Sequence, residues 1–381
     1  MSKKKILFIS HDATRTGAPM VLLYFLRWLK NNTDIPFEII LRKGGKLKPE
    51  FKKLARVTVF NPECFIPFFN KNRYHNKLKN RLLKENIGLI YSNTITNGFV
   101  QKFLSFLNCP MICHVHELEH SIKHIVDKIN LLNVKKYTTH YIAGSKAVKE
   151  CLIDHNNIPN NVIDLVYEYI PIKYYKYSKD RIIKMKHRLN IPKNAFVVGG
   201  AGTMGWRKGS DLFVQLAKSL TIKKKMKMPA HFLWLGSDPS IFKDEYDRLM
   251  YDIEKSGLKK AVHLIGTKKN YMDYFALFDV FTMISREDSF PLVNLEAAIL
   301  SKPVICFDAS GSSKDFVEDD CGFVIPYLNI DKMAEKIIKM MRAPALVKRL
   351  GKAAREKVIK EHDVNNASEK LLNIINRFML K

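Results

Sequence analysis

The chain has 381 residues, more than a single hydrophobic core usually serves, and we therefore expect two domains. Its hydrophobic content of 46% and charged content of 27% are those of a globular protein, and no apolar run reaches the roughly 20 residues that span a bilayer. We identify no secretory signal, and none of the six cysteines forms a C-x-x-C pair, so reduced cytosolic thiols are expected.

The net charge of +27 is unevenly distributed. Residues 42–84 hold thirteen lysines and arginines against two acidic residues. Such a patch favours nucleic acid, anionic lipid or a polyanionic substrate as partner. Within it, residues 64–84 set Phe65, Ile66, Phe68 and Phe69 beside cations, which suits an anionic membrane surface. A solvated, lysine-rich face explains the same composition equally well.

In the first half of the chain, short apolar runs of the kind that form buried strands alternate with stretches of helical spacing. The runs are 6–10, 37–41, 57–60, 89–92, 111–115, 141–144 and 162–166. Helical spacing between runs is clear in 20–30 and 146–153. The alternation predicts a parallel, doubly wound sheet.

The pattern fails at residues 168–179, which we interpret as a linker, and then restarts. The second set of expected strands is 196–200, 232–236, 262–265, 280–284, 304–307 and 322–325, and the chain is helical from 331 with a break at Pro344. We therefore predict two Rossmann-like domains facing a cleft, over 1–175 and 176–360. A C-terminal helix over 361–381 is expected to return to the first domain. Ligands of such sheets bind at the carboxyl ends of the strands.

The first loop of interest, SHDATRTGAP at 10–19, joins the first expected strand to the first helix. Gly17 would lie at the helix start, where backbone N–H groups attract a phosphate or a sugar. A plain turn between strand and helix explains the same residues.

Residues 116–120 fit H-E-x-x-H, the signature of zinc proteases. That site needs both histidines one turn apart on a helix, together with a third ligand. Here Pro110 and the apolar run 111–115 predict a strand, so His116 falls at the strand's end, before any helix begins. We therefore expect no metal at this site, and we place His120 on a helix surface.

The stretch VVGGAGTMGWRKGSDL at 197–212 runs from a strand through a glycine-rich loop into a helix. Glycines allow close backbone approach, and Arg207 and Lys208 beside a helix N-terminus suit a diphosphate. The spacing is neither that of a P-loop nor a clean G-x-G-x-x-G. A glycine turn with two solvated cations is the alternative.

The stretch SREDSFPLVNLEAA follows the expected strand 280–284 and starts a helix, with Pro291 in its first turn. Glu296 can accept two hydrogen bonds from a vicinal diol such as that of ribose. Asp288 can accept a hydrogen bond from a sugar hydroxyl, or it can cap the helix, with Glu296 merely solvated.

A fourth loop, within 301–315, offers the hydroxyls and backbone N–H groups of small residues, Ser312 among them, to a polar ligand; a flexible helix entry is the alternative. The four loops follow four different strands, two in each half of the chain. Their expected convergence on one cleft carries more weight than any single motif.

With these motifs the sequence resembles glycosyltransferase family 4, retaining enzymes of the GT-B fold that use nucleotide-sugar donors. The likeness covers nearly the whole chain and is most specific from 196 to 325. The family's E-x7-E motif matches at Asp288 and Glu296, with aspartate in first position, and EDSFPLVNLEA is close to its usual run.

The resemblance implies roles for single residues. Glu296 would hold the ribose and Asp288 the donor sugar, with Phe290, Pro291 and Leu292 between them in the donor site. Lys208 matches the family's diphosphate lysine. The family's arginine position falls on Thr203, so the chain departs there, and Arg207 is the neighbouring cation. The acidic residue of the later loop appears as Asp315. HVHE resembles the segment whose histidine lies beside the donor sugar, which points to His116.

The resemblance further implies transfer with retention and a nucleoside diphosphate leaving group, whose charge Arg207, Lys208 and backbone N–H groups would stabilise. No carboxylate stands out as a covalent nucleophile, so a front-face route fits better than a two-carboxylate scheme. The chain has no D-x-D, and we expect neither metal nor cofactor.

We therefore expect a hexosyltransferase-type enzyme that transfers a sugar to a glycan or lipid-linked acceptor in cell-surface polysaccharide synthesis. It would be cytoplasmic and bound peripherally at the inner membrane face. Two alternatives stay open. A sugar-nucleotide epimerase would share the architecture, and a nucleic-acid-binding protein would rest on the charge alone, since no nucleic-acid motif appears.

Overall fold

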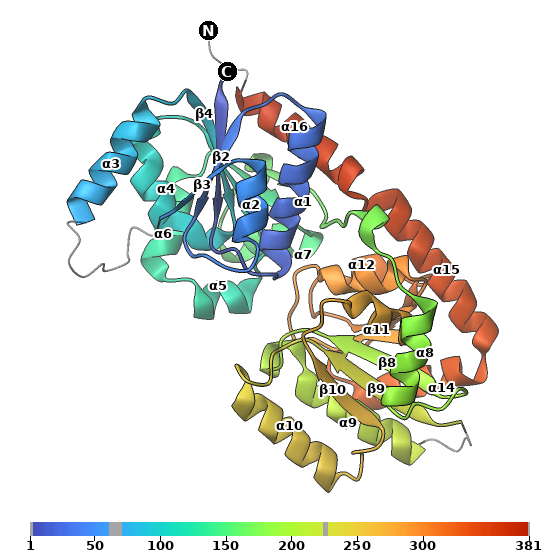
Figure 1. Cartoon of the computed structure of the whole chain (residues 1–381). Coiled ribbons are helices and arrows are strands. Elements are labelled where there is room, and N and C mark those ends of the chain that lie inside the picture. The colour runs from blue at the N-terminus through green and yellow to red at the C-terminus, as the bar shows by residue number, and fades with distance from the viewer. Residues whose placement is uncertain (1–2, 61–70, 224–227, 380–381) are drawn as a thin grey trace. The chain divides into compact units, whose positions relative to one another are not determined.

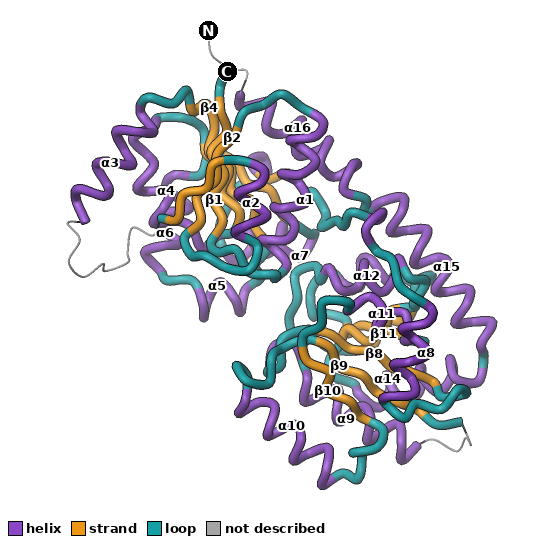
Figure 2. The backbone as a smooth tube through the Cα atoms, viewed as in Figure 1, coloured by secondary structure: helices purple, strands orange, loops and turns teal. Residues whose placement is uncertain are grey.

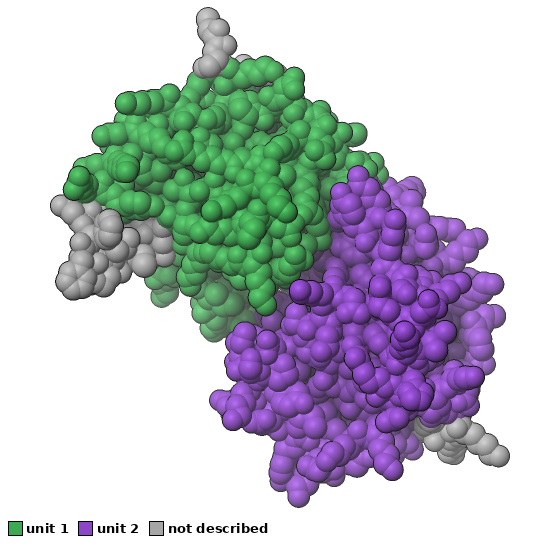
Figure 3. All heavy atoms as spheres, in the orientation of Figure 1, with its two compact units in different colours: residues 1–169, 364–381 green, residues 170–363 purple. Residues whose placement is uncertain are grey.

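The computed structural model describes residues 3–60, 71–223 and 228–379. The chain divides into two compact units, unit 1 with Met1–Tyr169 and Val364–Lys381, and unit 2 with Ile170–Asp363 (Figure 3). The first boundary lies before the 175/176 position expected from sequence, because Tyr169 is buried in unit 1 and donates a hydrogen bond to the carbonyl of Val21 at 3.3 Å.

The described part of unit 1 holds a seven-stranded parallel sheet in the order β3-β2-β1-β4-β5-β6-β7 (Figure 2). Its strands are β1 Lys5–Ser10, β2 Phe37–Leu41, β3 Arg56–Val59, β4 Ile87–Asn93, β5 Met111–Val115, β6 His140–Ala143 and β7 Ile163–Leu165. Its α-helices are α1 Gly17–Asn32, α2 Lys48–Leu54, α3 Lys71–Leu83, α4 Gly98–Leu104, α5 Glu119–Ile125, α6 Lys128–Tyr137, α7 Lys146–Glu150 and α16 Val364–Met379 (Figure 1).

The described part of unit 2 holds a six-stranded parallel sheet in the order β10-β9-β8-β11-β12-β13. Its strands are β8 Phe196–Ala201, β9 Ala230–Leu235, β10 Val262–Gly266, β11 Val280–Met283, β12 Val304–Phe307 and β13 Gly322–Ile325. Its α-helices are α8 Lys179–Arg188, α9 Ser210–Lys223, α10 Lys243–Lys255, α11 Tyr271–Leu277, α12 Leu292–Ile299, α13 Ser313–Val317, α14 Ile330–Arg342 and α15 Pro344–Glu361.

The doubly wound fold class is confirmed. Each expected strand corresponds to an observed strand, and the ends of the two differ by at most two residues. The strands read as continuous apolar runs because helices cover both faces of each sheet. Residues 6–9 of β1 are fully buried, as are residues 304–307 of β12. Apolar burial on both faces is the main stabilising contribution to each unit.

The C-terminal helix α16 belongs to unit 1, although unit 2 lies between it and the rest of that unit in sequence. It packs against α1 and β4. Leu371, Ile374 and Ile375 form its buried stripe. Polar contacts fasten its end: Arg377 pairs with Asp164, and the ammonium of Lys4 donates to the carbonyl of Met379 at 3.1 Å.

In each sheet the strand order reverses direction at one point, between β1 and β4 in unit 1 and between β8 and β11 in unit 2. Ligands of open α/β sheets bind outside the carboxyl ends of the strands at such a switch point. The sequence-predicted loops at 10–19 and 197–212 follow β1 and β8, so each begins at a switch point.

No helix in the described ranges is both long enough and apolar enough to cross a membrane. Of the basic segment 64–84, residues 64–70 lie outside the described residues, including the aromatic cluster 65–69. The remainder forms α3, which exposes Arg73, Lys77 and Lys79.

Candidate functional site

The glycine-rich loop of unit 2 leaves β8 at Ala201 and enters α9 at Ser210. Gly202, Gly205 and Gly209 all have positive φ, which only glycine adopts without strain. At Gly209 a Cβ atom would lie 2.1 Å from the carbonyl oxygen of Ile284, so glycine is also required by space. The backbone here therefore runs against the end of β11, at the switch point.

Lys208, at the end of this loop, forms a buried ion pair with Asp288. Burial lowers the pKa of Lys208, the neighbouring Arg207 lowers it further, and Asp288 opposes both effects. The ammonium and the carboxylate come from the loops that follow the two strands of the switch point, and the side chains are 17% and 10% exposed. A buried cation at this place offers an anionic ligand a charge partner that is little solvated.

Arg207 and Arg286 join the glycine loop to the loop after β11. The guanidinium of Arg207 donates to the carbonyl of Glu287 at 2.8 Å. Arg286 donates to both carboxylate oxygens of Asp211 at 2.9 and 2.7 Å and lies 5.2 Å from the ring centroid of Trp206. Arg286 was not predicted as a site residue, since a lone arginine after a strand belongs to no recognised motif. Thr203, the predicted departure from the family pattern, is exposed.

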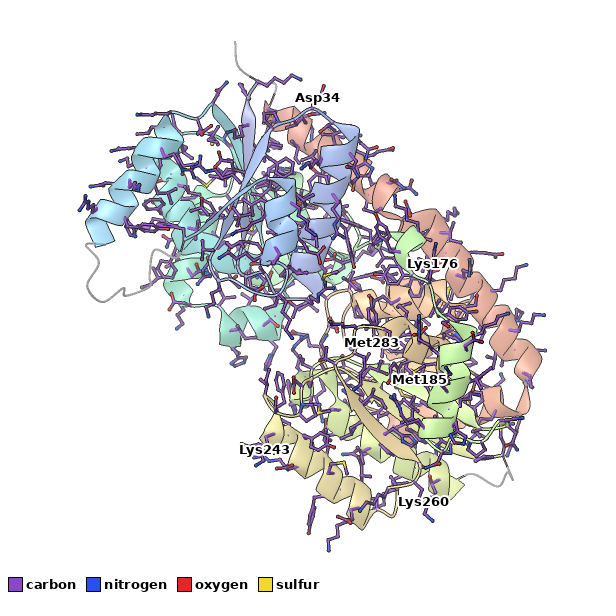
Figure 4. All side chains as sticks on the ribbon, in the orientation of Figure 1. Asp34, Lys176, Met185, Lys243, Lys260 and Met283 are labelled. Atoms are coloured by element: carbon purple, nitrogen blue, oxygen red, sulfur yellow. The ribbon has the colours of Figure 1, made fainter. Side chains whose placement is uncertain are left out.

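The loop after β12 is joined to the same place. Asp288 donates its N–H to the carbonyl of Ser310 at 2.7 Å, and Ser312 donates its N–H to that of Ser289 at 3.2 Å. Asp288 thus forms a bridge with Gly311. Three of the loops singled out in the sequence, or parts of them, therefore meet within unit 2; Met283, labelled in Figure 4, is the last residue of β11.

Glu296 lies on α12, where one carboxylate oxygen, Oε1, accepts hydrogen bonds from Tyr271 at 2.8 Å and Tyr175 at 3.1 Å. Burial raises the pKa of Glu296, and the two tyrosine hydroxyls partly offset that rise. Neither tyrosine was predicted. Tyr271 stands at the start of α11 and Tyr175 in the expected linker, and no local pattern relates them to position 296.

The predicted donor-site residues between Asp288 and Glu296 differ in placement. Phe290 is buried, with its ring 5.1 Å from the imidazole of His362. Pro291 is the N-cap residue of α12, and no side chain caps that helix. Leu292 is half-buried. Phe290 therefore anchors the loop to unit 2. Its packing fixes the backbone between Asp288, which precedes it in the chain, and Glu296, which follows it.

In unit 1, His116 lies just past the end of β5, between two acceptors. Its Nδ1 is 2.5 Å from Oε1 of Glu168, and its Nε2 is 2.9 Å from Oδ1 of Asn93. The amide of Asn93 is oriented by donation from Nδ2 to the carbonyl of Ala18 at 2.9 Å, so Oδ1 faces His116 as an acceptor. Both ring nitrogens of His116 thus meet acceptors, which is the arrangement of a protonated imidazolium.

The electrostatic surroundings of His116 agree with this geometry. Burial lowers its pKa, but the adjacent Glu168 carboxylate outweighs burial and holds the pKa of His116 above the ordinary value. Glu168 was not predicted as a site residue. It lies 52 residues away in sequence, in the stretch interpreted as a linker.

The second histidine of the strand, His114, is fully buried and behaves in the opposite way. Its Nδ1 lies 2.8 Å from the hydroxyl of Tyr91, and burial holds its pKa well below the ordinary value. Its Nε2 is buried without a hydrogen-bond partner. The ring lies 4.2 Å from that of His116, so two imidazoles whose pKa values are displaced in opposite directions lie side by side.

One group in the described ranges could hold a metal ion: His114, His116 and Glu168 have ligand atoms within 4.8 Å of one another. Binding there would require His116 to give up a proton and a hydrogen bond to Glu168 or Asn93. Because both nitrogens of His116 already face acceptors, the donor set fits a proton better than a metal ion.

The H-E-x-x-H match at 116–120 runs from the end of a strand into the start of a helix, as predicted. β5 ends at Val115 and α5 begins at Glu119, so His116 precedes the helix and His120 lies on it. The imidazole of His120 lies 4.6 Å from that of His124 on the same helix. The two histidines of the signature therefore do not share a helical face, as a zinc protease requires.

Gly17 is exposed at the first position of α1. The helix has no side-chain cap and no acidic residue in its first turn. A Cβ atom at Gly17 would meet no atom within 4 Å, so packing does not require a glycine. The N–H groups of Gly17 and Ala18 belong to the first turn of this 16-residue helix, where backbone N–H groups have no partner within the helix.

Comparison with known proteins links these features to a group of enzymes. Residues 181–357 match the family model described as glycosyl transferases group 1. The poly(ribitol-phosphate) alpha-N-acetylglucosaminyltransferase of Staphylococcus aureus (strain COL) is 30% identical over 191 residues, which are 49% of this chain and 37% of that protein. The chain thus spans little more than a third of that relative's length.

Two further comparisons cover almost the whole chain. The capsular polysaccharide biosynthesis glycosyltransferase CapM of Staphylococcus aureus is 22% identical over 369 residues, 93% of this chain and 92% of that protein. The crystal structure of Anabaena Alr3699/HepE in complex with UDP and glucose has a TM-score of 0.84 at 19% identity, covering 98% of this chain and 99% of that one. The likeness shows that the fold is GT-B.

Proposed function

We propose that the protein transfers a sugar from a nucleoside diphosphate sugar to an acceptor, since residues 181–357 match the family model of glycosyl transferases group 1. The observation that carries the proposal is the buried Lys208–Asp288 pair at the switch point of unit 2. A cation there suits a diphosphate, and a carboxylate beside it suits a sugar hydroxyl.

We assign the donor's parts to residues of unit 2. Lys208 and Arg207 bind the diphosphate, and the ordered N–H groups of the glycine loop and the loop at Ser312 add further donors. Asp288 accepts from the sugar. Glu296 accepts from the ribose diol through Oε2, because Oε1 is already engaged by two tyrosines. Anabaena Alr3699/HepE, with UDP and glucose bound, supports this class of donor.

In this proposal the leaving group is stabilised by protein cations. As the bond from the anomeric carbon to the diphosphate breaks, negative charge grows on the phosphate oxygens. Lys208 and Arg207 lie on one loop and supply positive charge there without a metal ion, as electrostatic catalysis requires. We propose that the reaction needs neither metal nor cofactor.

We propose that the reaction retains the anomeric configuration. Of the two carboxylates of the proposed donor site, Asp288 pairs with Lys208 and Glu296 accepts from two tyrosines, so neither stands free as a nucleophile. That is the arrangement of a front-face route rather than a double displacement. We assign His116 to the reacting sugar, with Gly17 and the start of α1 as a further contact of unit 1.

For the acceptor we propose a glycan or a lipid-linked glycan of cell-surface polysaccharide synthesis. Named relatives support this class: one glycosylates poly(ribitol phosphate), and one acts in capsular polysaccharide biosynthesis. Work on a lipid-linked acceptor would place the protein in the cytoplasm at the inner membrane face. Residues 64–84 are one proposed contact, through the cations of α3 among the described residues.

A thermal-shift screen against a panel of nucleoside diphosphate sugars tests the assignment, run in parallel with Glu296→Ala. We expect one donor class to raise the melting temperature of the wild type and to lose most of that effect in the variant. Asp319→Ala, at an exposed carboxylate outside the site, is the matched control and should respond like the wild type. A wild type that responds to no donor, or a Glu296→Ala variant that responds fully, rejects the donor site.

A further inference from the structure

The consecutive helices α5 and α6 of unit 1 expose large aliphatic side chains. Ile125 is 67% exposed, Ile129 58% and Leu132 64%. Aliphatic side chains of this size are normally buried, and three together on one short segment mark an interaction surface. We call the following residues the α5–α6 face: Lys123, Ile125, Lys128, Ile129, Leu132, Lys135 and Lys136.

The residues of α6 in this face lie on one side of the helix. Positions 128, 129, 132, 135 and 136 recur at the spacing of successive helical turns. The buried residues of α6, Asn130, Asn133 and Val134, lie on the opposite side. The inner side of α6, with both polar and apolar residues, holds the helix to unit 1. Its outer side carries an exposed apolar stripe flanked by lysines.

α6 is held so that the stripe cannot turn inward. The side chain of Asn130 accepts from the N–H of Phe99 at 3.0 Å and donates to the carbonyl of Ile95 at 3.4 Å. A Cβ atom on Gly98 would lie 1.9 Å from the carbonyl oxygen of Asn130, so α4 and α6 approach as closely as a glycine allows. Ile129 and Leu132 consequently stay in solvent unless a partner covers them.

The charge of the face has one sign. Within the described ranges, none of its four lysines forms an ion pair, and Lys136 lies 5.5 Å from the ring centroid of Tyr137. Between residues 123 and 136 the one acidic residue is Asp127, which is occupied as the N-cap of α6, where it accepts from the N–H groups of Ile129 and Asn130 at 2.8 and 3.1 Å. The face therefore combines exposed aliphatic side chains with uncompensated positive charge.

We propose that the α5–α6 face docks unit 1 on an anionic lipid bilayer, with Ile125, Ile129 and Leu132 inserted among the acyl chains and the lysines at the head groups. Aliphatic residues flanked by lysines on an amphipathic helix are the pattern of interfacial membrane binding. Nucleic acid would match the lysines but leave the aliphatic stripe without a partner. The docking adds to the proposed transfer reaction and involves none of its site residues.

Vesicle co-sedimentation tests the inference with the full-length protein. The probes are vesicles of phosphatidylcholine alone and of phosphatidylcholine mixed with phosphatidylglycerol, at low and high salt. We expect binding to the anionic vesicles that weakens with salt. Ile129→Ser with Leu132→Ser should weaken it by roughly ten-fold or more, since two aliphatic side chains no longer leave water. Ile222→Ser with Ile241→Ser, both sites 73% exposed in unit 2, is the matched control and should bind like the wild type.

Two further variants distinguish a loss of membrane binding from a loss of the folded structure. Lys128→Glu with Lys135→Glu should lower binding to anionic vesicles by roughly five-fold or more for each lysine. Leu132→Trp should raise binding, because tryptophan is favoured at the membrane interface, and a gain cannot come from loss of fold. The donor thermal shift should be the same in all these variants and the wild type, so failure of docking is distinguishable from failure of the proposed transferase function.

Several outcomes overturn the inference. One is wild-type protein that stays in the supernatant with anionic vesicles at low salt. Another is binding that survives Ile129→Ser with Leu132→Ser but is lost with Lys77→Glu and Lys79→Glu on α3. A third is a wild-type dimer in size-exclusion chromatography that the aliphatic variant dissociates, which would assign the face to a second copy of the chain.

Discussion

His116 and Glu168 form a buried acid–base pair at the carboxyl end of the unit 1 sheet, with 2.5 Å between Nδ1 and Oε1. The side chains are 7% and 5% exposed, so water does little to screen the interaction. Asn93 accepts from the other ring nitrogen. These two acceptors favour the charged form of the His116 imidazole and fix its orientation.

Glu168→Gln should uncouple this pair. Without the carboxylate, burial dominates and the pKa of His116 falls below its wild-type value. We expect the transfer rate at neutral pH to fall on the order of a hundred-fold, the scale on which loss of one positioned electrostatic contact to the reacting group acts. The pH dependence of the His116 ring resonances measures the change directly. An unchanged His116 titration would contradict the assigned role of Glu168.

The same pair makes a prediction about stability and pH. The folded-state pKa of His116 lies above that of the unfolded chain, so its contribution is complete below the unfolded-state value and is lost as pH rises through the folded-state value. Denaturant unfolding of wild type and Glu168→Gln at a series of pH values should show a stability difference that is largest in mild acid and shrinks toward alkaline pH. A difference that grows with pH would have the wrong sign.

Lys208→Ala should leave the Asp288 carboxylate buried without its cation. We expect a loss of about 3 kcal/mol in the free energy of unfolding, the lower end for a broken buried pair, because both side chains keep some exposure. Lys208→Met combined with Asp288→Asn should recover much of that loss. Both variants should lose the thermal shift with a nucleoside diphosphate. Retention of that shift by Lys208→Ala would remove Lys208 from the diphosphate site.

Tyr271→Phe and Tyr175→Phe should each weaken donor binding by about ten-fold, the equivalent of one hydrogen bond to a charged group. Each variant removes a hydroxyl that offsets the effect of burial, so the pKa of Glu296 should rise further. Donor titration by calorimetry measures the affinity. Tyr274→Phe on the same helix, whose hydroxyl accepts from Arg188 at 2.6 Å, is the control and should leave affinity unchanged.

Gly209→Ala and Gly257→Ala separate steric demand from backbone strain. Their φ values are +73° and +69°, so both pay the left-handed penalty of about 1 kcal/mol. Only at Gly209 would the new Cβ meet a backbone oxygen, at 2.1 Å, while Gly257 has open space. Unfolding in denaturant should show a markedly larger loss for Gly209→Ala. Equal losses would mean that the glycine loop relaxes away from Ile284.

Metal removal should leave the enzyme intact. We expect transfer activity to survive a chelator and purified protein to contain no stoichiometric metal, because His116 faces acceptors on both ring nitrogens. Elemental analysis and an assay after chelation check this. Stoichiometric zinc that is lost in His114→Ala would show that the set of His114, His116 and Glu168 binds metal.

The sequence by itself determined the strands, the doubly wound class and the stretches 10–19, 197–212 and 285–298, because buried strands and the turn residues that end them are local patterns. Lys208, Asp288 and Glu296 lie in these stretches, and their spacing along the chain identified them. The exclusion of a zinc protease was equally local, since it depended on where β5 ends.

Only the tertiary structure decided which side chains meet. Glu168 reaches His116 from the stretch interpreted as a linker, and Tyr175 and Tyr271 reach Glu296 from two other segments. None of these partners stands at a helical or strand period from the residue it contacts. Periodicity reports which face of an element is buried, whereas the partner on that face is set by packing between elements distant in sequence.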